Sequence, residues 1–476
     1  MLFLISWEVW GMPRGIFPGN IGNGEKGMKI RKEDLLFDRK ALWKLLIPVM
    51  IEQLLTSFMG MADSVMVSRV GSAAISAVSL TDSINVLIIQ VLAALATGGT
   101  IVCSQYLGRE DRKSANNAAK QVLLTSFLIA LFLGVLCIVF CRPILHLVFG
   151  RVEAAVMDNS IVYFLITAVS FPFLAMFQAG SAFFRAGGNS RFPMLVSVTG
   201  NGLNIGLNAA LIFGLHMGVA GAAIATLIAR IFIAVFVLVS LRRDRQPIVL
   251  THYLKIKPDI PLILKVLGIG IPSGIENGMF QFGKLAIQSS VSTLGTTAIA
   301  AQAMTIILEN LNGIAGMGVG IAMMTVVGQA IGAGRREEAK YYIVKLTIYA
   351  EIIVVISCIL IRLVTEPVTW IAGMEKESVK QVIFMMNWIT LIKPLVWTLG
   401  FIPAFGLRAA GDVRFSMIVS TITMWCCRVA LATVLIRVVG MGPIAVWIGQ
   451  MSDWAIRAGI FSWRYLSGKW LEHKVI

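Results

Sequence analysis

The stretch that decides the fold occurs twice in this chain: residues 47–52 read IPVMIE and residues 271–276 read IPSGIE, at an offset of 224. The same offset holds without a gap as far as the pairs Gln105 with Gln329 and Arg112 with Arg336. Further along, FRAGGNSRF at 184–192 is echoed by LRAAGDVRF at 407–415. Chance similarity between apolar helices would not keep register through loops, so the chain is a duplication.

The composition places both halves in a membrane. Hydrophobic residues make up 57% of the 476 residues and charged residues only 14%, against about 25% charged in soluble proteins. A span needs roughly 20 apolar residues, which leaves room for about twelve. We expect spans near 43–67, 76–104, 117–142, 158–184, 192–215, 218–241, 262–291, 298–331, 338–362, 380–406, 415–437 and 442–463.

The predicted fold is all-α and integral to the membrane, with twelve transmembrane helices in two six-helix lobes. Six is even, so both halves insert with the same orientation and are related by a pseudo-two-fold axis along the membrane normal. We assign residues 35–241 to the first lobe and 262–465 to the second. Residues 1–34, 242–261 and 466–476 form an N-terminal segment, a linker and a tail, all cytoplasmic.

The net charge of +16 sits in loops between apolar segments, which argues against nucleic acid as a partner. Loops expected inside carry most of the basic residues, among them Arg39, Lys40, Arg109, Arg112, Lys113, Arg242, Arg243, Lys257, Arg335, Arg336, Arg408, Arg414, Arg464 and Lys469. The positive-inside rule then places both termini in the cytoplasm of a multi-pass plasma-membrane protein. We expect the chain to be a monomer.

Several protein classes find no support in the sequence. The six cysteines (Cys103, Cys137, Cys141, Cys358, Cys426 and Cys427) lack metal or secreted-framework spacing, so we interpret all six as packing residues. The first ten residues are too short to span and do not resemble a signal peptide, and translation from Met28 is a hypothesis. There is no nucleotide or HExxH motif, which argues against an enzyme and favours transport driven by an ion gradient without a cofactor.

Carboxylates in the expected spans are the first functional candidates, because an ionisable group at mid-membrane costs about 2.5–3.5 kcal/mol. Glu52 and Glu276 each follow a helix proline, and Asp63 lies on nearly the same face as Glu52, roughly 16 Å deeper. Such groups can bind a proton or Na⁺ and attract a cationic substrate. The alternative is that they only hydrogen-bond to neighbouring helices.

Amides and lysines complete the set of candidates. Asn201, Asn204 and Asn208 form one polar stripe, which suits either cation binding or contacts between helices. Asp82, Glu309 and Glu351 are further carboxylate candidates. Lys393 is expected to pair with Glu276 or Glu309, and Lys284 either snorkels to the interface or acts as a tethered cation in place of Na⁺. The glycines of two spans predict close helix packing: Gly98, Gly99, Gly313, Gly316 and Gly320.

With these residues in view, the chain resembles the multidrug and toxic compound extrusion (MATE) family from Leu35 onward. The resemblance is carried by MADS at 61–64, QYLG at 105–108, FRAGGN at 184–189 and LNIGLN at 203–208. It implies two six-helix lobes around a cleft, exchange of drugs for Na⁺ or H⁺ by alternating access, and a cation site in the first lobe at Asp63, Asn204 and Asn208.

Two departures from the family pattern affect the expected coupling ion. Relatives of the prokaryotic type often carry an aspartate where this chain has Asn208, and the tenth span offers Asn387 and Lys393 instead of an aspartate. Proton coupling through Asp63 is therefore favoured over a Na⁺ site in the second lobe.

The sequence thus predicts a secondary active exporter of organic cations or other amphipathic compounds. The nearest rival is a lipid-linked precursor flippase of the same superfamily, against which twelve spans and an acidic cleft argue. A channel or a membrane-embedded enzyme is a more distant rival, disfavoured by the duplication.

Overall fold

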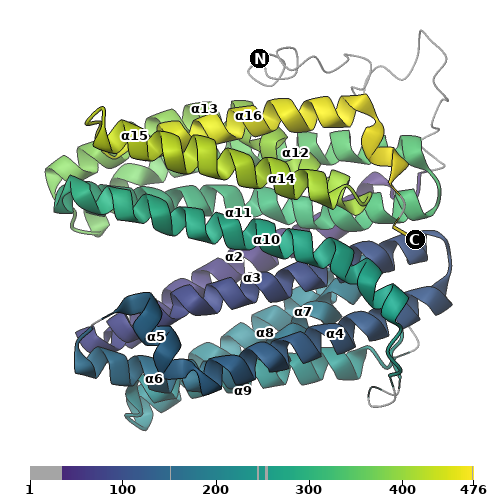
Figure 1. Cartoon of the computed structure of the whole chain (residues 1–476), viewed down its shortest axis with the longest axis horizontal. Helices are drawn as coiled ribbons and strands as arrows, with labels where there is room; N and C mark the ends of the chain where they lie inside the picture. The colour runs from purple at the N-terminus through teal and green to yellow at the C-terminus, as the bar shows by residue number, and fades with distance from the viewer. Residues whose placement is uncertain (1–34, 151, 244–245, 252, 254–255, 474) are drawn as a thin grey trace. The chain divides into compact units, whose positions relative to one another are not determined.

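A computed structural model describes residues 35–476 apart from 151, 244–245, 252, 254–255 and 474, and these residues form helices and no strand (Figure 1). The expectations about the first ten residues and Met28 lie outside the described residues. The first half contains α2 (Arg39–Ser68), α3 (Ser72–Gly108), α4 (Arg112–Val139), α5 (Cys141–Phe149), α6 (Ala154–Val169), α7 (Phe171–Ala186), α8 (Arg191–Asn208), the π-helical η3 (Ala209–Gly214) and α9 (Gly218–Ser240).

The second half repeats this order. It contains α10 (Ile260–Val291), η5 (Ser292–Leu294), α11 (Thr296–Gly332), α12 (Arg336–Ile371), α13 (Lys376–Ala409), α14 (Val413–Thr423), the π-helical η6 (Met424–Ala430), α15 (Leu431–Arg437), α16 (Ile444–Ser467) and η7 (Lys469–Glu472). Helices α3 and α11 have 37 residues each and begin 224 residues apart, which is the sequence offset. The fifth span of each half contains a π-helical segment, a feature common at functional sites.

Ten described helices are long and apolar enough to cross a membrane, and the pair α6 and α7 supplies an eleventh span. That pair is bent by 45° at Ser170, so the span expected at 158–184 consists of two helices. Pro172 stands at the start of α7, where its missing N–H cannot continue the α6 ladder. Helix α16 is not among these spans, because Gln450, Asp453 and Arg457 lower its hydropathy.

The chain packs as two compact units. The first-half unit comprises residues 51–277, and the second-half unit comprises residues 35–50 and 278–475. The start of the first helix of each half therefore belongs to the unit that is built mainly from the other half. The first turns of α2 stack Trp43 on Tyr349 of α12 (ring centroids 5.1 Å apart), and in the first-half unit Gly270 of α10 packs against Leu95 of α3.

Small residues set the closest helix contacts, as predicted. A Cβ added to Gly320 of α11 would stand 2.5 Å from Phe405 of α13, and one on Gly99 would stand 2.7 Å from Val122. The other glycines expected to pack closely do so too. The cysteine expectation needs one correction, because Cys426 is exposed and so contributes little to packing.

Candidate functional site

Asp63 lies near the end of α2 in the first-half unit, where its half-buried carboxylate meets the asparagines of α8. Asn208 Nδ2 donates to Asp63 Oδ1 (2.8 Å) and to Asn204 Oδ1 (3.0 Å), and Asn204 Nδ2 donates to Thr226 Oγ1 of α9 (3.3 Å). If the Asn204 amide is turned over, its nitrogen lies 2.9 Å from Asp63 Oδ1. In either orientation these four residues form one polar group between three helices.

A second carboxylate, Asp82 of α3, stands beside this group. It accepts hydrogen bonds from Asn85 Nδ2 (3.3 Å) and the Tyr163 hydroxyl (3.4 Å). Asp63 and Asp82 are close enough to repel each other, and the Arg230 guanidinium acts on both. We call Asp63, Asp82 and Arg230 together the charge cluster. With all three groups ionised its net charge is −1.

Two irregular backbone segments lie next to the charge cluster and the asparagines beside it. Ser170 stands at the break between α6 and α7, where its hydroxyl accepts a hydrogen bond from Arg230 Nη1 (2.6 Å). The π-helical η3 begins directly after Asn208. Asn208 Oδ1 is buried and accepts no hydrogen bond from the part of the chain that the structure describes. A bound cation, or a proton placed on the neighbouring carboxyl group, would satisfy such an acceptor.

Glu52 does not belong to the polar group around Asp63 and instead forms an ion pair. Its carboxylate lies 3.3 Å from Nη1 of Arg185 at the end of α7, and the two side chains are only 7% and 16% exposed. This contact corresponds to the alternative in which Glu52 serves helix packing. It also gives the arginine of the FRAGGN stretch a partner.

Lys393 is the most enclosed charge candidate of the second-half unit. Its side chain has no exposed area, and Nζ lies 2.8 Å from Glu309 Oε1. Nζ also lies 4.9 Å and 5.8 Å from the ring centroids of Trp397 and Trp454. The predicted carboxylate partner is therefore present and is Glu309. Glu276 is buried in the first-half unit.

A second buried pair joins α16 to α14. Arg457 Nε lies 2.6 Å from Asp453 Oδ1, and the guanidinium also donates to Thr423 Oγ1 (3.0 Å), Ser420 Oγ (3.1 Å) and Ser420 O (2.9 Å). This pair was not predicted from the sequence. Its signal was available, because Asp453 and Arg457 stand at i and i+4 in an otherwise apolar helix.

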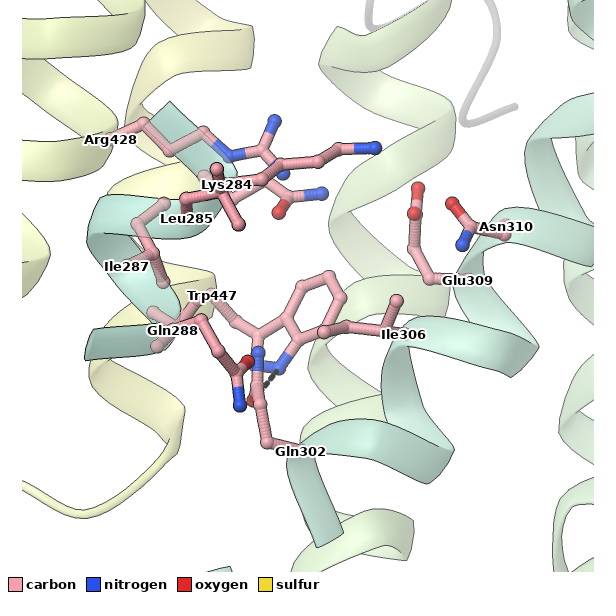
Figure 2. Close-up of a pocket in the computed structure, with 12 residues that line it drawn as sticks. Lys284, Leu285, Ile287, Gln288, Gln302, Ile306, Glu309, Asn310, Arg428 and Trp447 are labelled. Carbon is pink, nitrogen blue, oxygen red and sulfur yellow. Dashed lines mark hydrogen bonds between the residues drawn. The ribbon is translucent and has the colours of Figure 1, made fainter. Parts of the chain in front are cut away.

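A cavity of about 240 Å³ opens in the second-half unit, between α10, α11, η6 and α16 (Figure 2). Its exposed lining is mostly apolar, with Leu285, Ile287, Ile306, Val446 and Trp447, and its polar members are the amides and charged groups of Lys284, Gln288, Gln302, Glu309, Asn310, Arg428 and Gln450. Trp447 Nε1 donates a hydrogen bond to Gln302 Oε1 (2.9 Å), which holds the indole ring in place in the wall of the cavity.

The structure brings together only some of the predicted residues. Asn201 Nδ2 is buried without a hydrogen bond, so the three-asparagine stripe contributes two members to the polar group. Lys284 lies against Phe280 and lines the cavity, and Glu351 is buried in α12. Arg230 and Arg428 were missed, although a lone arginine in an apolar span is the same signal that identified the carboxylates.

Comparison with known proteins was made against this geometry. The MatE family model matches residues 48–210 and 272–434, two segments that begin 224 residues apart, as the repeat does. The probable multidrug resistance protein NorM of Thermotoga maritima is 28% identical over 463 residues, covering 94% of this chain and 96% of the relative. The multidrug export protein MepA of Staphylococcus haemolyticus is 23% identical over 384 residues, covering 80% and 83%.

Solved structures share the fold. A crystal structure of MATE in complex with MaL6 superposes with a TM-score of 0.84 at 22% identity, over 90% of this chain and 97% of that one. An outward-facing multidrug resistance MATE family transporter of the MOP superfamily gives 0.82 at 22% identity, over 91% and 97%. The predicted architecture of twelve helices in two lobes is that of these structures.

Proposed function

Since the chain belongs to the MATE family of multidrug efflux transporters, we propose that it exports organic cations or other amphipathic compounds in exchange for protons. In this proposal the two lobes give alternating access to the two sides of the plasma membrane, and both termini are cytoplasmic. The chain acts as a monomer. Asp63 is the group that takes up and releases the coupling proton.

The observation that carries the proposal is the polar group around Asp63 in an apolar surrounding. Its carboxylate is held by an amide donor, beside the unsatisfied acceptor of Asn208. Charge in a membrane span is costly, so a cluster with one excess negative charge favours uptake of one cation. A substrate cation and a proton would then compete for the same charge, which is the physical basis of exchange.

The charge of Arg230 favours the proton over Na⁺ as the coupling ion. The guanidinium already acts on both carboxylates, and Na⁺ brought to Asp63 would meet its repulsion. Asn208 Nδ2 also donates a hydrogen bond to Asp63 Oδ1. It therefore points a nitrogen at the carboxylate, whereas Na⁺ requires oxygen ligands. A proton bound to Asp63 neutralises the carboxylate and so places no separate cation beside the guanidinium. Na⁺ held by Asp63, Asn204 and Asn208 remains the alternative that the experiment must exclude.

Glu52 has a structural role in this proposal, because Arg185 already neutralises it. Glu276, Glu309, Asn201 and Lys393 are not assigned to proton transfer. Glu309 and Lys393 neutralise each other, so they change the charge of their unit only if the ion pair opens. The coupling step is thus assigned to the first lobe alone.

Ethidium transport in proteoliposomes tests the proposal, because ethidium is a permanent cation and only the protein titrates. A proton gradient should drive ethidium transport by the wild type, and a Na⁺ gradient alone should not. Asp63→Asn should lose gradient-driven transport. Asp158→Asn, the same change at an exposed residue of α6, is the matched control and should keep it. Transport by Na⁺ alone, or full activity of Asp63→Asn, would overturn the assignment.

A further inference from the structure

The cavity of the second-half unit has the opposite charge to the charge cluster of the first. Lys284 of α10 and Arg428 of η6 line it, together with Glu309. Glu309 already pairs with Lys393, and the nearby Asp453 already pairs with Arg457. Counting all six groups as ionised leaves two positive charges in excess, and both belong to side chains that line the cavity.

Neither of these two cations forms a contact ion pair among the described residues, because Glu309 and Asp453, which act on them from farther away, are already paired with Lys393 and Arg457. Lys284 Nζ lies 5.1 Å from the Phe280 ring centroid, and Arg428 Cζ lies 4.9 Å from the same centroid. Arg428 is only 8% exposed, and its Nε makes no hydrogen bond. Each cation is also close enough to repel the other. A buried guanidinium without a counter-ion is costly, and an anion between the two groups would relieve that cost.

The backbone places both groups for such an anion. Phe280, Lys284 and Gln288 stand four residues apart on α10, so they share one face. Arg428 belongs to the π-helical η6, and in Figure 2 its side chain and that of Lys284 extend across the same side of the cavity. The amides of Gln288 and Gln450 line the same space and can donate hydrogen bonds.

We propose that this cavity binds the acidic group of an amphipathic substrate, with Lys284 and Arg428 as its ligands. The acidic group is a carboxylate or a group of like charge, and the aromatic wall at Trp447 takes a planar ring beside it. At about 240 Å³ the cavity lies below the 300–1,000 Å³ of a complete drug site, so it receives one end of the molecule.

This inference rests on the proposed export function and adds a substrate class to it. A molecule with a cationic ring system and a carboxylate carries, besides its positive charge, the negative charge that the basic cavity can pair. Permanent cations without an acidic group would remain substrates but would leave Lys284 and Arg428 unused. The chain would therefore prefer zwitterions to their esters.

Rhodamine B and its ethyl ester test this preference, because they differ only in the free carboxylate. We would measure both dissociation constants by fluorescence anisotropy with the protein in phosphatidylcholine nanodiscs. The wild type should bind the acid more tightly than the ester. Each of Lys284→Gln and Arg428→Gln should weaken binding of the acid about tenfold, the worth of one charged hydrogen bond, and leave the ester unchanged. Lys284→Arg should restore the preference.

Lys380→Gln, an exposed lysine of α13 paired with Glu377, is the matched control and should change neither constant. The inference is overturned if the acid-to-ester ratio of the wild type persists in both variants, or if acid and ester weaken equally. It is also overturned if phosphatidylglycerol in the nanodiscs competes with the acid through Lys284 and Arg428, because lipid headgroups would then be the occupants. Failure of a proton gradient to drive the ester would instead overturn the proposed function.

Discussion

Replacement of Lys393 by methionine breaks a buried ion pair and leaves an unbranched side chain that is one heavy atom shorter. At 2.8 Å the attraction between Nζ and Glu309 Oε1 is about 6 kcal/mol with an effective dielectric constant of 20. Much of this is offset by the desolvation of both groups. Removal of one partner of a buried pair costs about 3–5 kcal/mol, because it leaves the other charge uncompensated.

We expect Lys393→Met to lower the free energy of unfolding by about 3 kcal/mol, the lower end of that range. The reason is that Lys284 and Arg428 also act on Glu309 and compensate part of the loss. Addition of Glu309→Gln should restore part of the stability, since no unpaired charge then remains. The double mutant should therefore be less destabilised than the two single changes combined, with a coupling of at least about 2 kcal/mol.

Unfolding by dodecyl sulfate in mixed micelles, followed by tryptophan fluorescence, measures these differences. Trp397 and Trp454 lie beside Lys393 and report on its surroundings. Lys380→Met makes the same change in a pair whose side chains are 76% and 59% exposed, and it should cost at most about 1 kcal/mol. The reasoning fails if Lys393→Met costs no more than Lys380→Met, or if the two changes at the buried pair are additive.

Three further predictions concern other parts of the molecule. Arg230→Gln removes the positive charge from the cluster, so a Na⁺ gradient should now drive ethidium export, whereas Arg230→Lys should behave as the wild type; an inert Na⁺ gradient in Arg230→Gln would contradict the role given to this charge. Gly320→Ala places a methyl group 2.5 Å from Phe405 and should cost about 1–3 kcal/mol in the same unfolding assay, and a stabilised variant would show that the contact relaxes freely. Asp111 caps α4 by accepting from Ser114 N (2.9 Å), and hydrogen bonds from the Ser114 side chain and then from its backbone N–H lower the pKa of Asp111. Its contribution is therefore present above the unfolded-state pKa and lost as the pH falls through the lower folded-state value. The melting temperature of Asp111→Ala should thus be lower than that of the wild type at pH 7 and the same as that of the wild type at acidic pH. A difference in melting temperature that is equal at both pH values would refute the role of Asp111 as a cap.

Much of the architecture could be predicted from residues near one another in sequence. Apolar runs identify spans because each helix must satisfy its backbone within itself. The repeat identified two equivalent halves because it keeps register through loops. Breaks inside a span were harder to predict. The bend at Ser170 comes two residues before Pro172, whereas Pro394 and Pro403 lie inside the single helix α13, so a proline alone does not predict a break.

The sequence by itself determined the membrane fold, its duplication and the list of charges that the membrane makes costly. Only the tertiary structure decided which of these charges meet. It paired Lys393 with Glu309, placed Arg230 where its charge acts on Asp63 and Asp82, and set Lys284 and Arg428 against one ring. The physical reason is that hydropathy reports how deep a residue can lie, whereas its partner depends on how each helix is rotated, bent or locally π-helical against its neighbours.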